Sequence, residues 1–133
     1  MVQKTLLRRS GETASLHAVG SYAQGYRAGS FVFLQGQTGL TLDGEVVAPG
    51  DPEAQTRQAM ENIRELMRLA GGDLADVVKI VVYITEREYR AKVYPVIDEY
   101  FGPQKPCSTG VVVKGLALDD FVVEIDAYGV IDE

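Results

Sequence analysis

The sequence has few residues that bind metals or form disulfides. Among its 133 residues it has one cysteine, Cys107, and one histidine, His17. A single cysteine excludes an internal disulfide, and one cysteine with one histidine cannot supply the usual set of zinc ligands within one chain. We therefore expect no zinc site of the usual Cys and His type.

Long apolar runs and an excess of positive charge are also missing. No stretch approaches the ~20 apolar residues that a membrane helix needs, and Met1 to Thr5 does not resemble a secretory signal. We therefore expect a cytoplasmic protein with no membrane partner. Thirteen basic and nineteen acidic side chains leave a net charge of -6, which disfavours nucleic acid as a partner.

The chain does have the composition of a folded domain. Hydrophobic residues make up 46% of it and charged residues 24%. It contains no low-complexity tract, no convincing repeat and no Pro/Ser-rich linker. We therefore predict one domain over residues 1–133.

Two helices are predicted by apolar residues at three- and four-residue spacing. The first begins after Asp51, a capping residue, and ends at Gly71-Gly72. The second runs from Tyr89 to Phe101, and Pro95 within it predicts a kink or a later start. The apolar stripe of the first helix consists of Met60, Ile63, Leu66, Met67 and Ala70.

Runs of β-branched residues predict the strands. The run from Val77 to Thr85 is apolar on both alternating faces, which favours a central strand covered on both sides. Further strands are predicted at 4–8, 30–35, 109–113 and 121–131. This order indicates an α+β fold with one mixed sheet and both helices on one face. Self-association would cover the other face.

Two carboxylates in the last predicted strand are the first candidates for chemistry. Glu124 and Asp126 alternate with apolar residues, so they lie on the same side of the strand. Acid/base chemistry needs carboxylates whose pKa values are pushed apart, and an apolar strand can do this. The alternative is a solvent-exposed face on which both acids only improve solubility. Glu124 is the better candidate because it lies at the middle of the strand.

A second group of candidates follows the strand SFVFL. Gly36, in the segment Gln35-Gly36-Gln37, would let backbone N–H groups approach a small ligand closely, although a bulge or turn explains such a glycine equally well. Cys107 has no base near it in the sequence, so packing is favoured over a nucleophilic role. His17 is interpreted as a surface histidine or one with its hydrogen bonds satisfied.

Six segments, in this order and spacing, resemble the YjgF/RidA family, which is also labelled endoribonuclease L-PSP. They are GSYAQG, QGQTG, DPEAQTRQAMENIRELMRLAGG with DVVKIVVYITE, YPVIDEYFG, STGVVVKGLA and VVEIDAYGV. The resemblance implies a chorismate-mutase-like fold and a homotrimer with a central β-barrel and clefts between subunits. It also implies hydrolysis of enamine and imine intermediates to 2-oxo acids and ammonia, without metal or organic cofactor.

The resemblance assigns roles to four positions of the chain. Tyr22 matches a tyrosine that lines the cleft, and Gly36 matches a glycine that offers backbone contacts, with Gln35 in place of the family's serine. Glu124 matches the glutamate that holds the attacking water. Tyr94 stands where the family has an asparagine, so that contact is lost.

The family's arginine, which binds the substrate carboxylate, has no counterpart here. Counting back from Glu124 without gaps puts Thr109 at that position. Matching Pro103 to Cys107 with the family's Pro-x-Arg-x-Cys would instead select Lys105, but it demands four extra residues in the hairpin before Glu124. We prefer Thr109. Because threonine cannot make the charged bidentate pair, the usual amino-acid-derived imine is expected to be a poor substrate.

Three functions remain open at this point. The first is a hydrolase or deaminase of small C=N compounds, with Glu124 holding water and Tyr22 donating a hydrogen bond. The second is a non-catalytic metabolite-binding trimer. The third, an endoribonuclease or translation inhibitor, receives little support from an acidic chain. The cations that could replace the arginine are Lys105, Lys114, Arg27 and Arg90.

Overall fold

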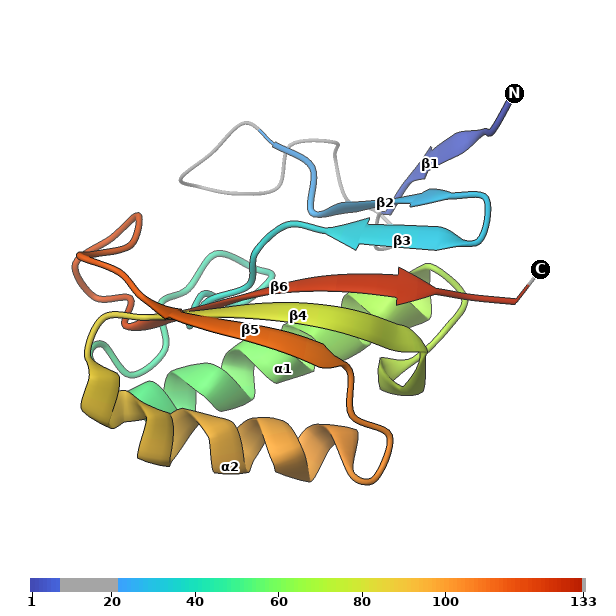
Figure 1. Ribbon diagram of the computed structural model, residues 1–133. Helices are drawn as coiled ribbons and strands as arrows, with labels where there is room; N and C mark the ends of the chain where they lie inside the picture. The colour runs from blue at the N-terminus through green and yellow to red at the C-terminus, as the bar shows by residue number, and fades with distance from the viewer. Residues whose placement is uncertain (8–21, 133) are drawn as a thin grey trace.

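Six strands form one mixed sheet in the order β1-β2-β3-β6-β4-β5 (Figure 1). All neighbours are antiparallel except β4 and β5, which are parallel. This computed structural model describes residues 1–7 and 22–132. The strands are β1 Lys4–Leu6, β2 Gly25–Ala28, β3 Phe31–Leu34, β4 Val77–Ile84, β5 Cys107–Val112 and β6 Val123–Val130.

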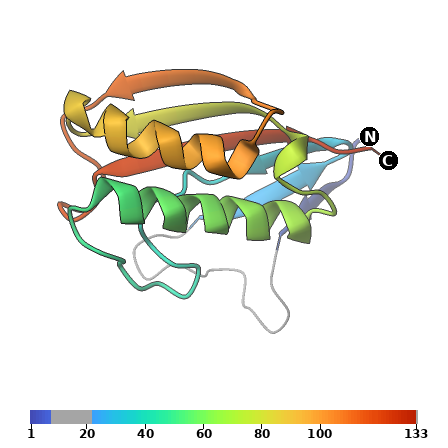
Figure 2. The same cartoon turned by 90° about the horizontal axis from the view of Figure 1, so that it is seen from below.

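Both helices cover the same face of this sheet (Figure 2). They are α1 Pro52–Leu69 and α2 Arg90–Phe101, with short 3-10 turns η1 Leu74–Asp76 and η2 Arg87–Tyr89 before β4 and α2. The Asp51 side chain caps α1 by accepting the Ala54 N–H at 3.0 Å. The predicted fold class, an α+β mixed sheet with two helices on one face, is confirmed.

The core lies between the helices and the sheet. Alternate residues of each strand face the helices, so Ile80, Val82 and Ile84 of β4 are buried. Each such aliphatic side chain contributes roughly 1.5–3 kcal/mol when fully buried. Fully buried partners from the other elements include Val32, Met60, Ile63, Met67, Val93 and Ile125.

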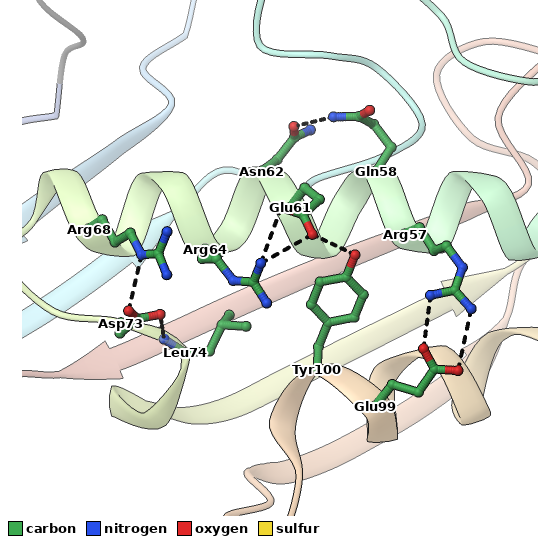
Figure 3. Close-up of polar contacts among 10 residues, drawn as sticks. All are labelled: Arg57, Gln58, Glu61, Asn62, Arg64, Arg68, Asp73, Leu74, Glu99 and Tyr100. Atoms are coloured by element: carbon green, nitrogen blue, oxygen red, sulfur yellow. Dashed lines mark hydrogen bonds and ion pairs between the residues drawn. The ribbon is translucent and has the colours of Figure 1, made fainter.

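Charged contacts join the two helices at their outer surface (Figure 3). Arg57 donates to both carboxylate oxygens of Glu99, at 2.9 and 3.3 Å. The Tyr100 hydroxyl donates to Glu61 at 2.6 Å, and Arg64 lies 5.0 Å from the centre of the Tyr100 ring. Because these groups are exposed, apolar packing contributes more to holding the helices together.

The structure differs from the predicted elements in three places. Strand β2 was not predicted, because its sequence GYRA is short and lacks an alternating apolar pattern. Helix α2 begins at Arg90 and continues through Pro95, so the later start is not found. Strands β5 and β6 do not form a hairpin: both pair with β4, and the chain from 113 to 122 crosses from one side of β4 to the other.

The sheet face opposite the helices is open within the chain. Directly paired residues share a face, so β2, β3 and β6 together present Tyr26, Phe31, Phe33, Tyr128 and Val130, all exposed. Phe33 makes an edge-to-face contact with Tyr128, at 6.2 Å between ring centres. We call these five residues the aromatic patch. Among the described helices, none has the length and apolar character of a membrane span.

Candidate functional site

A pocket of about 270 Å³ lies where the segment after β3 meets the beginning of β6. Four of the predicted site residues line it: Tyr22, Gln35, Gly36 and Glu124. Its other lining residues are Gln37, Thr38, Leu40, Ala117 and Phe121. The fold therefore brings a tyrosine, a glycine-containing turn and the strand glutamate together from three separate parts of the chain. A larger surface hollow of about 400 Å³ beside Met1 and Arg27 has no carboxylate, thiol or imidazole in its described lining.

Glu124 is the acidic group of this pocket. Strand β6 places Glu124 and Asp126 on the open sheet face, beside Tyr83 and Val81 of β4. The Glu124 side chain is partly buried, and no described residue donates a hydrogen bond to its carboxylate. Burial raises the pKa of Glu124 above its usual value, and the nearby charge of Asp126 raises it further. Such a carboxylate is suited to accept a proton from water.

Asp126 differs from Glu124 because it has a donor. The Tyr83 hydroxyl donates to Asp126 Oδ2 at 2.8 Å. This hydrogen bond, together with burial, raises the pKa of Tyr83 to about 12, so the phenol stays protonated and remains a donor. The two carboxylates thus have different surroundings, which is the asymmetry that acid/base chemistry requires.

Gly36 allows the backbone to approach these carboxylates. Gln37 and Ile125 exchange two backbone hydrogen bonds of 2.8 Å, which bring the turn onto β6. A Cβ atom at position 36 would overlap Glu124 Oε2 and lie 2.7 Å from Asp126 Oδ1. Only glycine fits here without displacing the acidic side chains.

Tyr22 supplies a hydroxyl to the same pocket. Its pKa is raised by partial burial and by the charge of Glu124, so it is a protonated donor at neutral pH. Tyr22 is the first residue of the described range 22–132. Ser21, which precedes it in the motif, and His17 both lie outside the described residues.

Gln37 is a lining residue that sequence reasoning missed. Its side chain is only 3% exposed and donates from Nε2 to Gln24 Oε1 at 3.0 Å and to the Gln35 carbonyl at 2.9 Å. The sequence signal for Gln37 is its place as a second glutamine, directly after an apolar strand and a glycine.

Tyr94, Lys105 and Thr109 do not reach this pocket within the chain. Lys105 forms an exposed ion pair with Asp98 at 3.1 Å and, with Tyr94, lines a separate cavity of about 100 Å³ between α2 and β5. Thr109 is exposed on β5, where its hydroxyl accepts a hydrogen bond of 2.7 Å from Lys79, a cation that the sequence analysis overlooked.

The other cations that could replace the family's arginine, Lys114, Arg27 and Arg90, are also absent from the described lining of this pocket. Arg27 donates to the carbonyls of Ala70 and Gly29, and Arg90 lies over the Tyr94 ring at 4.6 Å. Consequently the described lining of the Glu124 pocket includes no lysine or arginine. Cys107 is a free thiol at the start of β5, outside the pocket; it is exposed and not packed as predicted, because every position of β5 is exposed within the chain. Within residues 1–7 and 22–132, no group of three or more His, Cys, Asp or Glu side chains could hold a metal ion.

Comparison with known proteins assigns the family. Residues 12–131 match the family model named Endoribonuclease L-PSP. The chain therefore belongs to the YjgF/RidA family, as the six sequence segments indicated.

Individual relatives agree with this assignment. A RutC family protein of Pyrococcus horikoshii is 38% identical over 109 residues, which cover 82% of this chain and 86% of the relative. The structure of RidA from an Antarctic Psychrobacter is 31% identical, with a TM-score of 0.80 over 93% of this chain and all of that one. A Mycobacterium tuberculosis member of the YjgF/YER057c/UK114 family is 29% identical, with a TM-score of 0.80 over 97% of this chain and all of the other.

Proposed function

We propose that the chain is a cofactor-independent hydrolase of small enamines and imines, with Glu124 as its proton acceptor. The observation that carries this proposal is the Glu124 carboxylate: it faces a small pocket, lies against Gly36, has no described donor and has a raised pKa. A base is most effective when its pKa lies near the working pH, so raising a carboxylate pKa improves it as a base for water.

The proposed reaction converts a C=N compound and water into a carbonyl compound and ammonia. The substrate reacts as the iminium ion: its C=N carbon accepts the water oxygen while Glu124 takes a proton from that water, which gives a neutral carbinolamine. Glu124 then passes this proton to the amine nitrogen, the C–N bond breaks with its electron pair staying on nitrogen, and the hydroxyl proton leaves with the ammonia as ammonium while the C=O bond forms. Tyr22 donates a hydrogen bond to the substrate and orients it over the carboxylate.

We further propose that the pocket is completed by a neighbouring subunit of a homotrimer. Glu124 of the pocket and the aromatic patch lie on the same uncovered sheet face, and the resemblance to the family points to threefold assembly. In that arrangement Tyr94, Thr109 or Lys105 of one subunit would have to serve the pocket of the next.

The proposed substrate has no carboxylate next to the C=N bond. Such a carboxylate would meet Glu124 and no described cation in this pocket, and Thr109 offers one neutral hydroxyl instead of an arginine fork. A neutral or cationic imine avoids this repulsion.

A substrate panel tests the proposal. Wild-type protein should hydrolyse imines without a carboxylate faster than the 2-imino acids produced from leucine or methionine by an amino-acid oxidase. Thr109→Arg should raise the rate on the 2-imino acids relative to wild type, although Tyr94 can limit the gain. Rapid wild-type hydrolysis of those 2-imino acids would refute the assignment of Thr109. Binding of imine analogues with no turnover of any imine would instead support a non-catalytic metabolite-binding protein.

A further inference from the structure

The geometry points to Gln37 as a ligand-binding residue. We propose that Gln37 Oε1 accepts a hydrogen bond from a nitrogen-bound hydrogen of the ligand, so that the pocket selects planar cations carrying N–H groups, such as iminium and amidinium ions. The reaction such a ligand undergoes rests on the proposed function, whereas its binding does not.

The orientation of the Gln37 amide is set by a backbone group. The two ends of a glutamine amide differ only in hydrogen-bonding capacity: the nitrogen donates two hydrogen bonds and the oxygen only accepts. One end faces the Gln35 carbonyl at 2.9 Å, and a carbonyl can only accept, so that end is the nitrogen. The oxygen must therefore be the other terminal atom, whichever way Gln24 is oriented.

The nitrogen has no remaining capacity. Its two hydrogens go to the Gln35 carbonyl and to Gln24 Oε1. The backbone N–H and C=O of Gln37 are likewise used, since both pair with Ile125. Every polar group of this residue except Oε1 therefore has a partner inside the protein.

Oε1 has no donor among the described residues, although Gln37 is almost completely buried and lines the Glu124 pocket. A buried carbonyl without a donor is unfavourable by a free energy similar to that of a lost hydrogen bond. Water or a ligand can satisfy it, and the pocket that Gln37 lines is the described space from which either could reach this residue. A ligand that offers an N–H there gains a hydrogen bond that a ligand without one cannot make.

The charge of the pocket favours a cationic donor. Glu124 lines the same pocket as Gln37, and the described lining contains no lysine or arginine to balance the negative charge of its carboxylate. An iminium or amidinium ion supplies both the positive charge and the N–H groups in one plane. Hydrogen bonds that involve a charged partner are about twice as strong as neutral ones, so this class of ligand uses both acceptors.

Calorimetric titration with two amidinium ions tests this directly. Acetamidinium has four N–H hydrogens, whereas tetramethylacetamidinium has the same charge and none. Wild-type protein should bind acetamidinium more tightly by about tenfold or more. Gln37→Met, which keeps the length and burial of the side chain, should lose most of this preference. Gln104→Met, at an exposed glutamine outside the pocket, should keep it.

The decisive quantity is the difference between wild type and Gln37→Met in their preference for acetamidinium. The bulk of the methyl groups of tetramethylacetamidinium affects both proteins equally, so it cancels in this comparison. An unchanged preference in a folded Gln37→Met protein overturns the inference. Where Gln37→Met does not fold, a wild-type crystal soaked in acetamidinium decides: a ligand nitrogen within hydrogen-bonding distance of Gln37 Oε1 supports the inference, and acetamidinium bound elsewhere or not at all overturns it. Lack of imine turnover with an intact N–H preference would reject only the proposed function.

Discussion

Glu124 owes its properties to its neighbours. Strand β6 is apolar on its helix side, so the strand holds its position while Glu124 projects to the opposite face. There Gly36 packs against the carboxylate and removes water from one side, and Asp126 adds a like charge two residues away. Burial and repulsion both oppose the charged form, and no described donor offsets them. The result is a carboxylate that is easier to protonate than an exposed one.

This raised pKa predicts a pH-dependent effect on stability. A carboxyl whose pKa is higher in the folded state contributes stability below its unfolded pKa, and this is lost as pH rises through the folded pKa. Replacing Glu124 by glutamine should therefore increase the free energy of unfolding relative to wild type at pH 7 to 8. The gain should shrink as pH falls through the raised pKa of folded Glu124 toward the usual glutamate value of about 4.3, and it should be absent below that value.

Urea denaturation of both proteins across this pH range measures the effect. Glu45→Gln, at an exposed turn position, is the matched control and should show no such trend. A Glu124→Gln protein that is less stable than wild type at pH 8 would contradict the burial of an uncompensated charge.

At the scale of elements, one buried glutamine joins α1 to the loops around the pocket. Gln55 Nε2 lies within hydrogen-bonding distance of the carbonyls of Val47, Ala48 and Asp120, and Gln55 Oε1 accepts the Val122 N–H at 3.0 Å. These hydrogen bonds fix the position of the segment that precedes β6, and this segment carries Phe121 of the pocket wall. The side chain is completely buried, so water cannot replace it.

We therefore expect Gln55→Met to destabilise the protein by roughly 2–4 kcal/mol, because the buried Val122 N–H and at least one carbonyl lose their partners. Urea denaturation checks this value, with Gln104→Met as the control expected to change stability by less than about 0.5 kcal/mol. A change of similar size in both variants would show that the Gln55 hydrogen bonds do not hold the loop.

The elements with strong periodic patterns were predictable from the sequence, whereas those held by tertiary contacts were not. Helix α1 has a cap at Asp51 and a regular apolar stripe, and β4 is a run of β-branched residues. By contrast, β2 is recognisable only from its pairing with β1 and β3. The position of β5 is likewise recognisable only from its pairing with β4, because every residue of β5 is exposed within the chain.

The same distinction applies to the site. Glu124 could be identified because a charge within an apolar strand is unusual, and Gly36 because it follows a strand. Lys79 could not, because its partner Thr109 lies on the neighbouring strand β5. For Gln37 the sequence shows a second glutamine after the glycine, but not which of its polar atoms has a partner in the fold. Hydrogen bonds between residues on different elements leave no trace in residue spacing.

At the scale of the whole molecule, the aromatic patch is the feature that the chain leaves uncovered. Phe31 and Phe33 are 56% and 48% exposed, next to Tyr128 on β6. A cluster of large apolar side chains on one face marks an interaction surface. A face shared by identical subunits fits the homotrimer in the proposal.

We predict a trimer by analytical ultracentrifugation and loss of that trimer in Phe33→Glu, because each copy would bury an uncompensated charge in the interface. Leu69→Glu, an equally drastic change at an exposed position at the end of α1 on the helix side, should leave the trimer intact. A wild-type monomer at micromolar concentration would refute the trimer, and a trimer that tolerates Phe33→Glu would place the interface away from the aromatic patch.

The rate of imine hydrolysis by Glu124→Gln, compared with wild type on the best substrate of the panel, tests the central claim most directly. Glutamine keeps the size of the side chain but cannot take a proton from water. The comparison requires that ultracentrifugation shows the same assembly for both proteins. The account predicts a loss of roughly a hundred- to ten-thousandfold in turnover. Equal turnover by the two proteins would contradict it and remove Glu124 from the chemistry.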